Sequence, residues 1–476
     1  MSALDTARAR VRDAAGAELV ERLEHLDATR ARRPADDDAP SAPDARASFD
    51  CDVALVGAGL SILYAVTLAR RGLSVTVFER SRAGAAHREW NASGRELRRL
   101  IDAGVADERD LDAMTVARYD RGICRWHGGG TYPVREVLDH AVDAGALLSL
   151  ARARAEALGV RFVDGVTATG LAHGPSGVSI RLRDKDNART DVTARVMVDA
   201  RGASSPYATA DLLCPTVGGV LTGLEAGEAP DQMDPRVGDI LVTTEGVEDG
   251  RQHIWEGFPG RPGETTVYTF FYDRAERVGD HALLRLYARF FAQLPRYKRG
   301  DATLVRPTFG YIPGWSRLTP APRAPSPRVV LVGDAAARHS PLTYCGFGAT
   351  LRSLAPATER ISRLVRDGVP AGVVVDDAPV HAGTGALAHM IASPPKDPRR
   401  AGELNALLDA AFNTLHEMGQ DAYAALLRDE MSAKDLVRFL HRTSLRFPSV
   451  YPSVVRVLGV GGVSRWGAGI ARGLFT

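Results

Sequence analysis

The segment CDVALVGAGLSILYAVTLARRGLSVTVFER, residues 51–80, constrains the fold more than any other part of the chain. An apolar run leads into Gly57 and Gly59, apolar residues at helical spacing follow, and a second apolar run ends at Glu79. Strands that alternate with helices in this way form a parallel sheet. The predicted elements are a strand at 51–56, a helix at 59–71 and a strand at 74–79. We therefore expect an α/β fold with a Rossmann-like domain.

The two glycines are typical of a turn that binds a dinucleotide. Gly57 permits a tight turn, and Gly59 lets a pyrophosphate approach the start of the helix, where free N–H groups and the helix dipole favour an anion. Glu79 is placed to accept hydrogen bonds from a ribose. Ile62 occupies the position of the third glycine of the usual pattern, which loosens the match. Taken alone, this segment leaves NAD and FAD equally open.

A second glycine-rich segment, RVVLVGDAAARHSPLTYCGFGATLRSL at 328–354, lies far downstream. A predicted strand at 329–332 delivers Gly333 and Asp334. Pro341, Gly346, Phe347 and Gly348 then precede a predicted helix. The segment resembles the Gly-Asp motif of glutathione-reductase-type and hydroxylase-type FAD proteins. The resemblance implies that Asp334 binds the ribityl chain and that the glycines bring the backbone next to the isoalloxazine ring. The alternative is an acidic helix cap followed by a glycine turn.

Smaller matches favour FAD over NAD. VDARGASSP at 198–206 resembles the turn that re-enters the FAD domain in this superfamily, and YPVREVLDHAV at 132–142 resembles a helix that carries an FAD-contacting arginine, here Arg135. Arg88 is a candidate for contact with the flavin or its phosphates, and Arg80 and Val166 are further candidate cofactor contacts. The alternative for Arg88 and Arg135 is a solvated surface arginine.

Four segments in a fixed order resemble the Cru-type lycopene cyclases over most of residues 50–430. They are HREWNASGRELRRLIDAG at 87–104, HIWEGFPG at 253–260, FAQLPRYK at 291–298 and GDAAARHSPLTYCGFGATLRSL at 333–354. The chain departs from the family pattern at Ala336, at Tyr344-Cys345 and at His339, all beside the expected flavin ring. These departures put the substrate in doubt more than the cofactor.

The resemblance implies ring closure of a linear carotene without net redox change. A carboxylic acid in a dry pocket would protonate an alkene, because burial raises its pKa and keeps the proton available. A reduced, anionic flavin would stabilise the resulting carbocation. Glu256, between Trp255 and Phe258, is the candidate acid, and His339 and Glu89 are second choices. Each has a structural alternative: Glu256 at a strand edge facing water, His339 as a cap of the loop, and Glu89 paired with Arg88.

The same motifs leave other functions open. A flavin monooxygenase or prenyl reductase acting on a lipophilic substrate would share them, and so would a non-catalytic flavin-binding or pigment-binding membrane protein. NADPH is a candidate electron donor, but no second dinucleotide motif assigns it.

The pattern of elements predicts a discontinuous domain organisation. A helix over 3–30 and a linker rich in Pro, Ala and Asp precede the catalytic body, and short alternating strands such as 178–183, 193–201 and 265–273 suggest a second, antiparallel sheet inserted into the first domain. Helices are expected at 94–118, at 134–157 and over most of the chain after 350. The expected domains are an N-terminal segment at 1–48, an FAD-binding domain at 49–206 and 325–370, a substrate domain at 207–324 and a helical region at 371–476.

Composition limits the partners. Sixty basic and 58 acidic residues give a formal charge of +2, so no global field favours nucleic acid. The four cysteines lie far apart, without the spacing of a zinc site or a disulfide framework, and a cytoplasmic location is expected because the sequence shows no signal-like segment. From Leu436 onward the chain has no acidic residue and six arginines, which predicts either peripheral contact with an anionic membrane or helices packed with their arginines outward.

Overall fold

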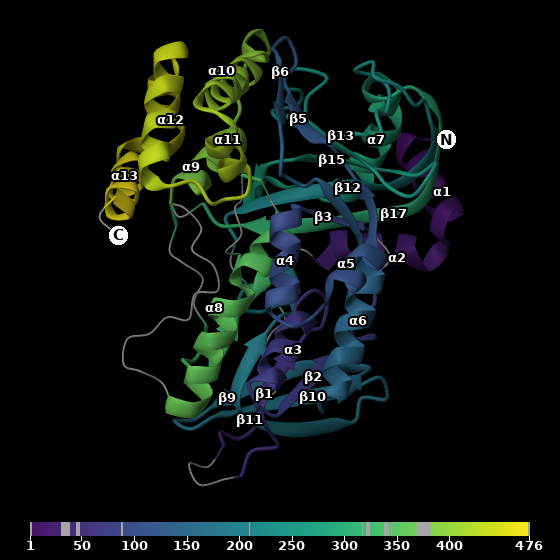
Figure 1. The fold of residues 1–476 in the computed structure, drawn as a ribbon, viewed down its shortest axis with the longest axis vertical. Helices are drawn as coiled ribbons and strands as arrows, with labels where there is room; N and C mark the ends of the chain where they lie inside the picture. Colours follow the sequence, from purple (N-terminus) through teal and green to yellow (C-terminus); the bar gives the residue numbers. More distant parts are fainter. Residues whose placement is uncertain are drawn as a thin grey trace.

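The computed structural model describes residues 2–29, 39–43, 48–86, 89–208, 210–316, 318–319, 324–337, 342–343, 345–368 and 382–474. Two sheets dominate it. The first lies in the lower half of Figure 1 behind helices α3, α4, α6 and α8, and the second crosses the upper half with α7 beside it. The C-terminal helices pack at one end of the second sheet, and the two N-terminal helices lie at its other end (Figure 1).

The first sheet has a parallel core in the order β8-β2-β1-β11-β18. Its strands are β1 (Cys51–Val56), β2 (Val75–Glu79), β8 (Arg161–Asp164), β11 (Arg189–Asp199) and β18 (Val329–Leu331). The helices α3 (Ile62–Arg70), α4 (Gly94–Asp102), α5 (Glu108–Met114), α6 (Ala144–Ala157) and α8 (Gly346–Asp367) contribute to the core on one face of this sheet. The strand-helix-strand order predicted for residues 51–79 is confirmed.

Strand β11 joins distant parts of the chain. Its N-terminal half pairs antiparallel with β10 (Val178–Asp184), which in turn pairs with β9 (Val166–His173). Its C-terminal half pairs in parallel with β1 on one side and with β18 on the other. The strands predicted at 178–183 and 193–201 therefore belong to the first sheet. Their assignment to the inserted sheet is wrong, because alternation in the sequence reports a half-buried strand but not its neighbours.

The second sheet is eight-stranded, in the order β16-β12-β15-β14-β13-β5-β6 with β17 also paired to β12. Its strands are β5 (Arg121–Arg125), β6 (Thr131–Val134), β12 (Leu212–Leu224), β13 (Val237–Val242), β14 (His253–Pro259), β15 (Thr265–Phe271), β16 (Asp273–Arg274) and β17 (Gly300–Gly314). All pairings are antiparallel except β13 with β5. The sheet thus draws strands from both sides of the boundary expected at 206/207.

A small sheet links the two large ones. It consists of β3 (Glu89–Ala92), β7 (His140–Asp143) and β4 (Thr115–Arg118) in the order β3-β7-β4. The helix predicted at 134–157 is wrong in its first part: α6 begins at Ala144, where the Asp143 carboxylate accepts a hydrogen bond from the Ala146 N–H at 3.0 Å. The helix predicted at 94–118 is likewise split into α4, α5 and β4.

The N-terminal segment forms two helices, α1 (Ala3–Ala15) and α2 (Ala17–Thr29), rather than the single helix predicted. Gly16, with φ of 84°, separates them in a conformation that favours glycine. Both helices pack on α7 (Ala282–Tyr297) and β17, where Ala7, Val11, Val20 and Leu23 are buried. Much of the predicted linker, residues 30–38 and 44–47, lies outside the described residues.

The C-terminal region is helical, as predicted. It consists of α9 (Ala382–Ile391), α10 (Glu403–Met418), α11 (Gln420–Leu427), α12 (Ala433–Arg446) and α13 (Val450–Leu474). Helix α13 has non-helical backbone angles at Gly459 but continues through Gly461 and Gly462. Among the described residues, the chain has no helix with the length and apolar character needed to cross a bilayer.

Gly57 offers a direct test of the turn on which the first sheet depends. Its φ is 92°, and a Cβ atom placed there would lie 2.5 Å from the Ala200 carbonyl oxygen. We expect Gly57→Ala to lower the free energy of unfolding by about 2 kcal/mol or more, measured by urea denaturation. Gly59→Ala is the matched control, because a Cβ atom at residue 59 would have no neighbour within 4 Å and the φ of this residue is not left-handed. Equal effects of the two substitutions would contradict this account of the turn.

Candidate functional site

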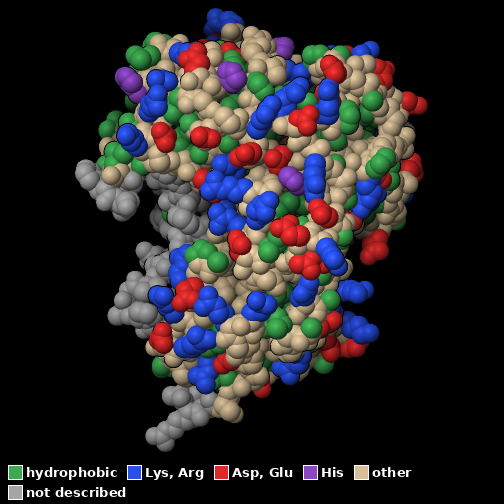
Figure 2. Space-filling view, in the orientation of Figure 1, with side chains coloured by type: hydrophobic (Ala, Val, Ile, Leu, Met, Phe, Trp, Pro, Cys, Tyr) green, Lys and Arg blue, Asp and Glu red, His purple; other side chains and the backbone are tan. Residues whose placement is uncertain are grey.

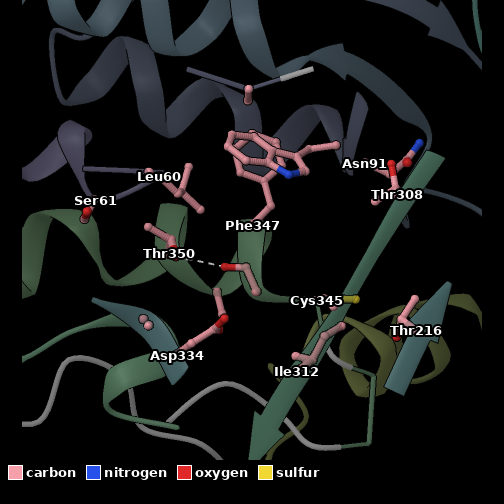
Figure 3. A pocket seen from close by; sticks show the side chains of 18 of the residues that line it. Leu60, Ser61, Asn91, Thr216, Thr308, Ile312, Asp334, Cys345, Phe347 and Thr350 are labelled. Carbon is pink, nitrogen blue, oxygen red and sulfur yellow. Dashed lines mark hydrogen bonds between the residues drawn. The ribbon is translucent and has the colours of Figure 1, made fainter. Parts of the chain in front are cut away.

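A cavity of about 470 Å³ lies between the first and second sheets. The first sheet contributes the turn after β1, the end of β18 and the start of α8, and the second contributes β12, β14, β15 and β17. Figure 3 shows Leu60, Ser61 and Asp334 on one side of the cavity and Thr216, Thr308 and Ile312 on the other. Among the described residues, no lysine or arginine lines it. The cavity thus joins the dinucleotide-type turn to the face of the second sheet.

The turn after β1 provides the conformation expected for a pyrophosphate site. The Gly57 N–H donates to the Phe78 carbonyl at 2.8 Å, which closes the turn against β2. Gly59 and Ser61 line the cavity, and the space beyond the Gly59 Cα is open. The N-cap residue of α3, Ser61, makes no side-chain cap hydrogen bond. The helix N-terminus can therefore direct its positive dipole end at an anion in the cavity.

Glu79 stands beside this turn, and its carboxylate already has protein partners. It accepts hydrogen bonds from the Ala58 N–H at 2.8 Å and from the N–H and hydroxyl of Ser81, both at 3.1 Å. It does not line the cavity, and neither do the exposed Arg80 or Val166, which is half-buried at the start of β9. The structure thus places Glu79 as a support of the glycine turn, and ribose binding by its carboxylate stays a prediction.

The downstream segment reaches the same cavity. Gly333 and Asp334 form a short 3₁₀ turn directly after β18, and Gly346 and Phe347 open α8; all four line the cavity. The N-cap residue Cys345, also in the lining, makes no side-chain cap hydrogen bond, so a second uncapped helix N-terminus faces the cavity. The two motifs separated in sequence therefore meet, and their combined shape fits a cofactor with an anionic centre and a ribityl-like polyol.

Gly348 serves packing rather than the cavity. A Cβ atom at this position would lie 2.3 Å from the Glu96 Oε1 atom, so α4 can approach α8 only because residue 348 has no side chain. Glu96 is buried, forms the capping box of α4 with Ser93 and pairs with Arg352 of α8. Three other predicted site residues, Arg88, His339 and Pro341, lie outside the described residues.

Arg135 does not line the cavity, although a nearby residue does. Its side chain is exposed, while its backbone N–H and carbonyl are held by the Gln420 amide of α11 at 3.0 and 2.7 Å. Arg428 donates to the Glu136 carbonyl at 2.8 Å, and Leu138 of the same loop lines the cavity with a left-handed φ of 50°. The C-terminal helices thus fix a cavity wall. No local pattern in the sequence predicts this contact, because it joins residues nearly 300 positions apart.

Glu89 is buried in a network of ion pairs. It is 4% exposed, and its carboxylate accepts hydrogen bonds from Arg261 at 2.9 Å, Thr266 at 3.2 Å and Arg306 at 3.3 Å. These contacts connect β3 to the second sheet. Glu89 thus forms a structural ion pair, the predicted alternative to a catalytic role, with Arg261 and Arg306 as its partners. Arg88, the partner that the sequence suggested, lies outside the described residues. The two arginines give Glu89 a structural role in joining β3 to the second sheet.

Glu256 has the opposite environment. It lies on β14, an interior strand between β13 and β15, and its partly buried side chain lines the cavity. Among the described residues, no hydrogen bond or ion pair reaches its carboxyl group. Removal from solvent alone raises the pKa of Glu256 to about 8. At neutral pH this carboxyl group therefore holds a proton within the cavity.

The neighbours of Glu256 are mainly apolar or aromatic. Tyr268 on β15 is its direct cross-strand partner and lines the cavity beside it, and Phe258 lies two residues further along the same face of β14. Phe258 packs against Tyr119 with ring centroids 6.0 Å apart. Trp90 and Phe347 also line the cavity, and their ring centroids lie 5.2 Å apart. Aromatic faces near a proton donor are suited to stabilising a cation.

Comparison with solved structures places this fold among flavoproteins. The halogenase PltM matches with a TM-score of 0.59 at 13% identity over 89% of this chain and 96% of its own, and it has also been solved with phloroglucinol and FAD. A geranylgeranyl bacteriochlorophyll reductase-like protein from Thermoplasma acidophilum matches with a TM-score of 0.53 at 17% identity, over 86% and 98% of the two chains. The p-nitrophenol 4-monooxygenase PnpA from Pseudomonas putida matches with a TM-score of 0.54 at 13% identity, over 80% and 98%.

No protein-family model and no curated protein sequence matches the chain. At these identities the structural matches establish the fold, and fold alone does not determine the reaction. They confirm the predicted fold class, a Rossmann-like α/β domain combined with a mainly antiparallel sheet and a helical C-terminal region.

The environment of Glu256 predicts a pH-dependent stability difference. Its pKa is about 8 in the folded chain against an ordinary value of 4.5, so the folded state binds more protons than the unfolded state between these values. Stability should therefore fall as pH rises through this window. A shift of this size corresponds to at most about 5 kcal/mol of unfolding free energy. The effect is smaller here because the Glu256 side chain is only partly buried and faces the cavity. As pH rises from 4.5 to 9, we expect the free energy of unfolding of Glu256→Gln to increase relative to that of the wild type by a few kcal/mol. Urea unfolding across this pH range measures the difference.

The control is Glu21→Gln, which removes a solvent-exposed carboxyl group on α2. Solvent screens this group, so the substitution should change stability little across the series. A constant difference between Glu256→Gln and the wild type from pH 4.5 to 9 would contradict the raised pKa.

Proposed function

We propose that the chain is an FAD-dependent enzyme in which Glu256 donates a proton to a lipophilic substrate. The observation that carries the proposal is the position of Glu256: a carboxyl group that is largely removed from water, with no ion-pair partner among the described residues, lines the same cavity as Gly59, Asp334 and the start of α8. The structural matches to halogenase, monooxygenase and reductase-like flavoproteins support FAD as the cofactor. Gly59 and the α3 N-terminus would hold the pyrophosphate, and Asp334 the ribityl chain.

The reaction that this arrangement favours is the cyclisation of a linear carotenoid or related isoprenoid, as the resemblance to Cru-type lycopene cyclases implies. Glu256 transfers its proton to a terminal alkene carbon, and the neighbouring double bond attacks the resulting carbocation. The ring cation then returns a proton to the Glu256 carboxylate, which leaves a neutral product and restores the acid. Atoms and electrons balance without an oxidant. Bound in its reduced form, FAD supplies negative charge next to the cation. Phe258, Tyr268 and Trp90 offer aromatic faces to this cation.

A second candidate is a net redox reaction on a lipophilic substrate, such as hydroxylation or prenyl reduction. The structural matches favour it, because a monooxygenase and a reductase-like protein are among them. The two candidates differ in their electron balance. NADPH would be the electron donor in the redox case, and in the cyclase it would serve only to keep the flavin reduced.

An anaerobic assay separates the candidates. The purified protein is loaded with FAD, the flavin is chemically reduced, lycopene is added in detergent, and both products and flavin absorbance are followed. Cyclisation predicts ring-containing product with the flavin still reduced after many turnovers. Oxidation of one flavin for each product formed would establish a reductase, and product that forms only after oxygen is admitted would establish a hydroxylase. Either result would overturn the cyclase proposal.

Glu256→Gln tests the proposed proton donor. We expect it to lower product formation at least 100-fold, because the amide cannot supply the proton, while FAD binding followed by flavin fluorescence stays unchanged. Glu256→Asp should keep part of the activity, since it retains an acid displaced by one methylene. Asp334→Asn should show the converse pattern, with FAD binding weakened. Unchanged carotenoid output from Glu256→Gln in a lycopene-accumulating host would remove Glu256 as the acid.

A further inference from the structure

Most of the exposed apolar side chains of the described chain gather on α12 and α13. Among the described residues, seven large apolar side chains are exposed, and six of them lie between residues 437 and 474. They are Val437, Leu445, Tyr451, Val455, Val460 and Leu474, with Leu445 at 67% and Val460 at 77%. The seventh, Leu158, follows α6 in the other half of the molecule. Single exposed apolar residues are ordinary, but a concentration of them marks an interaction surface.

Helix α13 contacts the rest of the molecule mainly through α9 and α12 (Figure 1). In its described part only Gly462 is buried, and every large apolar residue of the helix is at least partly exposed. An apolar helix of this kind is stable in a protein when something covers it. We call the exposed faces of α12 and α13 the tail surface.

The charge of the tail surface is positive apart from Asp435 in the first turn of α12. Residues 436–476 include no aspartate or glutamate. Among the described residues, Arg438, Arg442, Arg456 and Arg465 form no salt bridge, whereas Arg446 pairs with Glu417 of α10. In Figure 2 blue and green side chains are interspersed at the upper left, where α12 and α13 lie. Arg456 lies close enough to Glu403 to help lower the pKa of that carboxyl group, without a salt bridge. The tail surface thus combines a net positive charge with exposed apolar groups.

We propose that the tail surface docks on an anionic lipid bilayer. Arginines beside Leu, Val and Tyr side chains suit the boundary between headgroups and acyl chains, where apolar groups enter the interface and cations bind anionic lipid. A second copy of the chain fits less well. A two-fold contact would place this surface against itself, bringing arginines together with no carboxylate in the segment to balance them.

The tail surface is also continuous with the cavity wall. Ile470 of α13 packs against the hydrophobic cluster that includes Leu138 and Phe258, both of which line the cavity. A bilayer on the tail surface would therefore lie beside a hydrophobic cluster that reaches the cavity, and we infer that an apolar substrate would come from that bilayer. This last step rests on the proposed function, whereas the docking itself does not.

Co-sedimentation with vesicles tests the proposal on the full-length chain. The probes are vesicles of phosphatidylcholine alone and vesicles with half of the lipid replaced by phosphatidylglycerol. We expect binding to the anionic vesicles that weakens with added salt and is at least about tenfold stronger than to phosphatidylcholine alone. Arg456→Gln and Arg465→Gln should each lower the partition constant about fivefold.

Two leucine substitutions give a matched comparison. Leu445→Asp should lower binding to anionic vesicles about tenfold or more, because it removes an exposed apolar group of the tail surface and adds a negative charge. Leu158→Asp makes the same chemical change at an exposed leucine outside the tail surface and should leave binding unchanged. Circular dichroism melting is the control that both variants are folded. Val460→Asp provides a second position if Leu445→Asp fails to fold.

Three outcomes would overturn the proposal. The first is the absence of binding to anionic vesicles. The second is an equal loss of binding in Leu445→Asp and Leu158→Asp. The third is that light scattering shows a wild-type dimer that Leu445→Asp dissociates, while neither the wild type nor this variant binds vesicles. FAD binding and product formation in detergent are measured on the same variants. Lost vesicle binding with retained activity in detergent separates a failure of docking from a failure of the proposed enzyme.

Discussion

The pairing of β11 with both β1 and β18 holds the candidate cofactor site together. Asp199, at the end of β11, is in register with Val56 on one side and Leu331 on the other, so the glycine turn and the Gly-Asp turn leave the sheet at the same edge. Ligands of parallel α/β sheets bind at this carboxyl edge. The buried Asp199 carboxylate is bound by Arg201 at 2.7 Å and by Ser205 at 2.7 Å, which fixes the turn that follows. That turn places the Ala200 carbonyl against Gly57, and so the backbone of residue 57 has room only for glycine.

The cavity has two chemically different ends because two sheets form it. At the first sheet it offers uncapped helix N-termini and backbone N–H groups, which bind an anion without a cationic side chain. At the second sheet it offers Phe258, Tyr268 and Ile312 from adjoining strands, with one carboxyl group among them. The polar cofactor and the apolar substrate that we propose would therefore require no shared contacts. Because the two sheets meet, these two ends lie within one cavity. The loop at 135–139, held by Gln420 and Arg428 of the C-terminal helices, forms one of its walls.

Local patterns predicted the elements of the first strand-helix-strand unit, but not the bounds of several other helices and not the long-range partners of the strands. The strand-turn-helix-strand unit at 51–79 follows from hydrophobic spacing and two glycines, and Asp334 could be joined to it only through a resemblance between motifs. By contrast, β5 enters the second sheet by pairing with β13 across more than 100 residues, and β6 joins it through β5. No feature of residues 121–134 indicates the β13 partner. Arg135 shows the same limit. The motif suggested a cofactor contact, but α6 begins nine residues later and the Arg135 side chain points to solvent.

Glu89 and Glu256 show how the fold treats two acids in one cavity. Glu89 is buried with Arg261, Arg306 and Thr266, so its charge is compensated and it joins β3 to the second sheet. Glu256 has no such partner among the described residues, and an acid removed from water without one destabilises the fold whenever it ionises. An apolar residue at this position of β14 would remove that penalty and preserve the packing against Phe258 and Tyr268. An uncompensated carboxyl group at this position costs stability, which is the pattern expected where function overrides local consistency, and it agrees with the proposed role of Glu256 as proton donor.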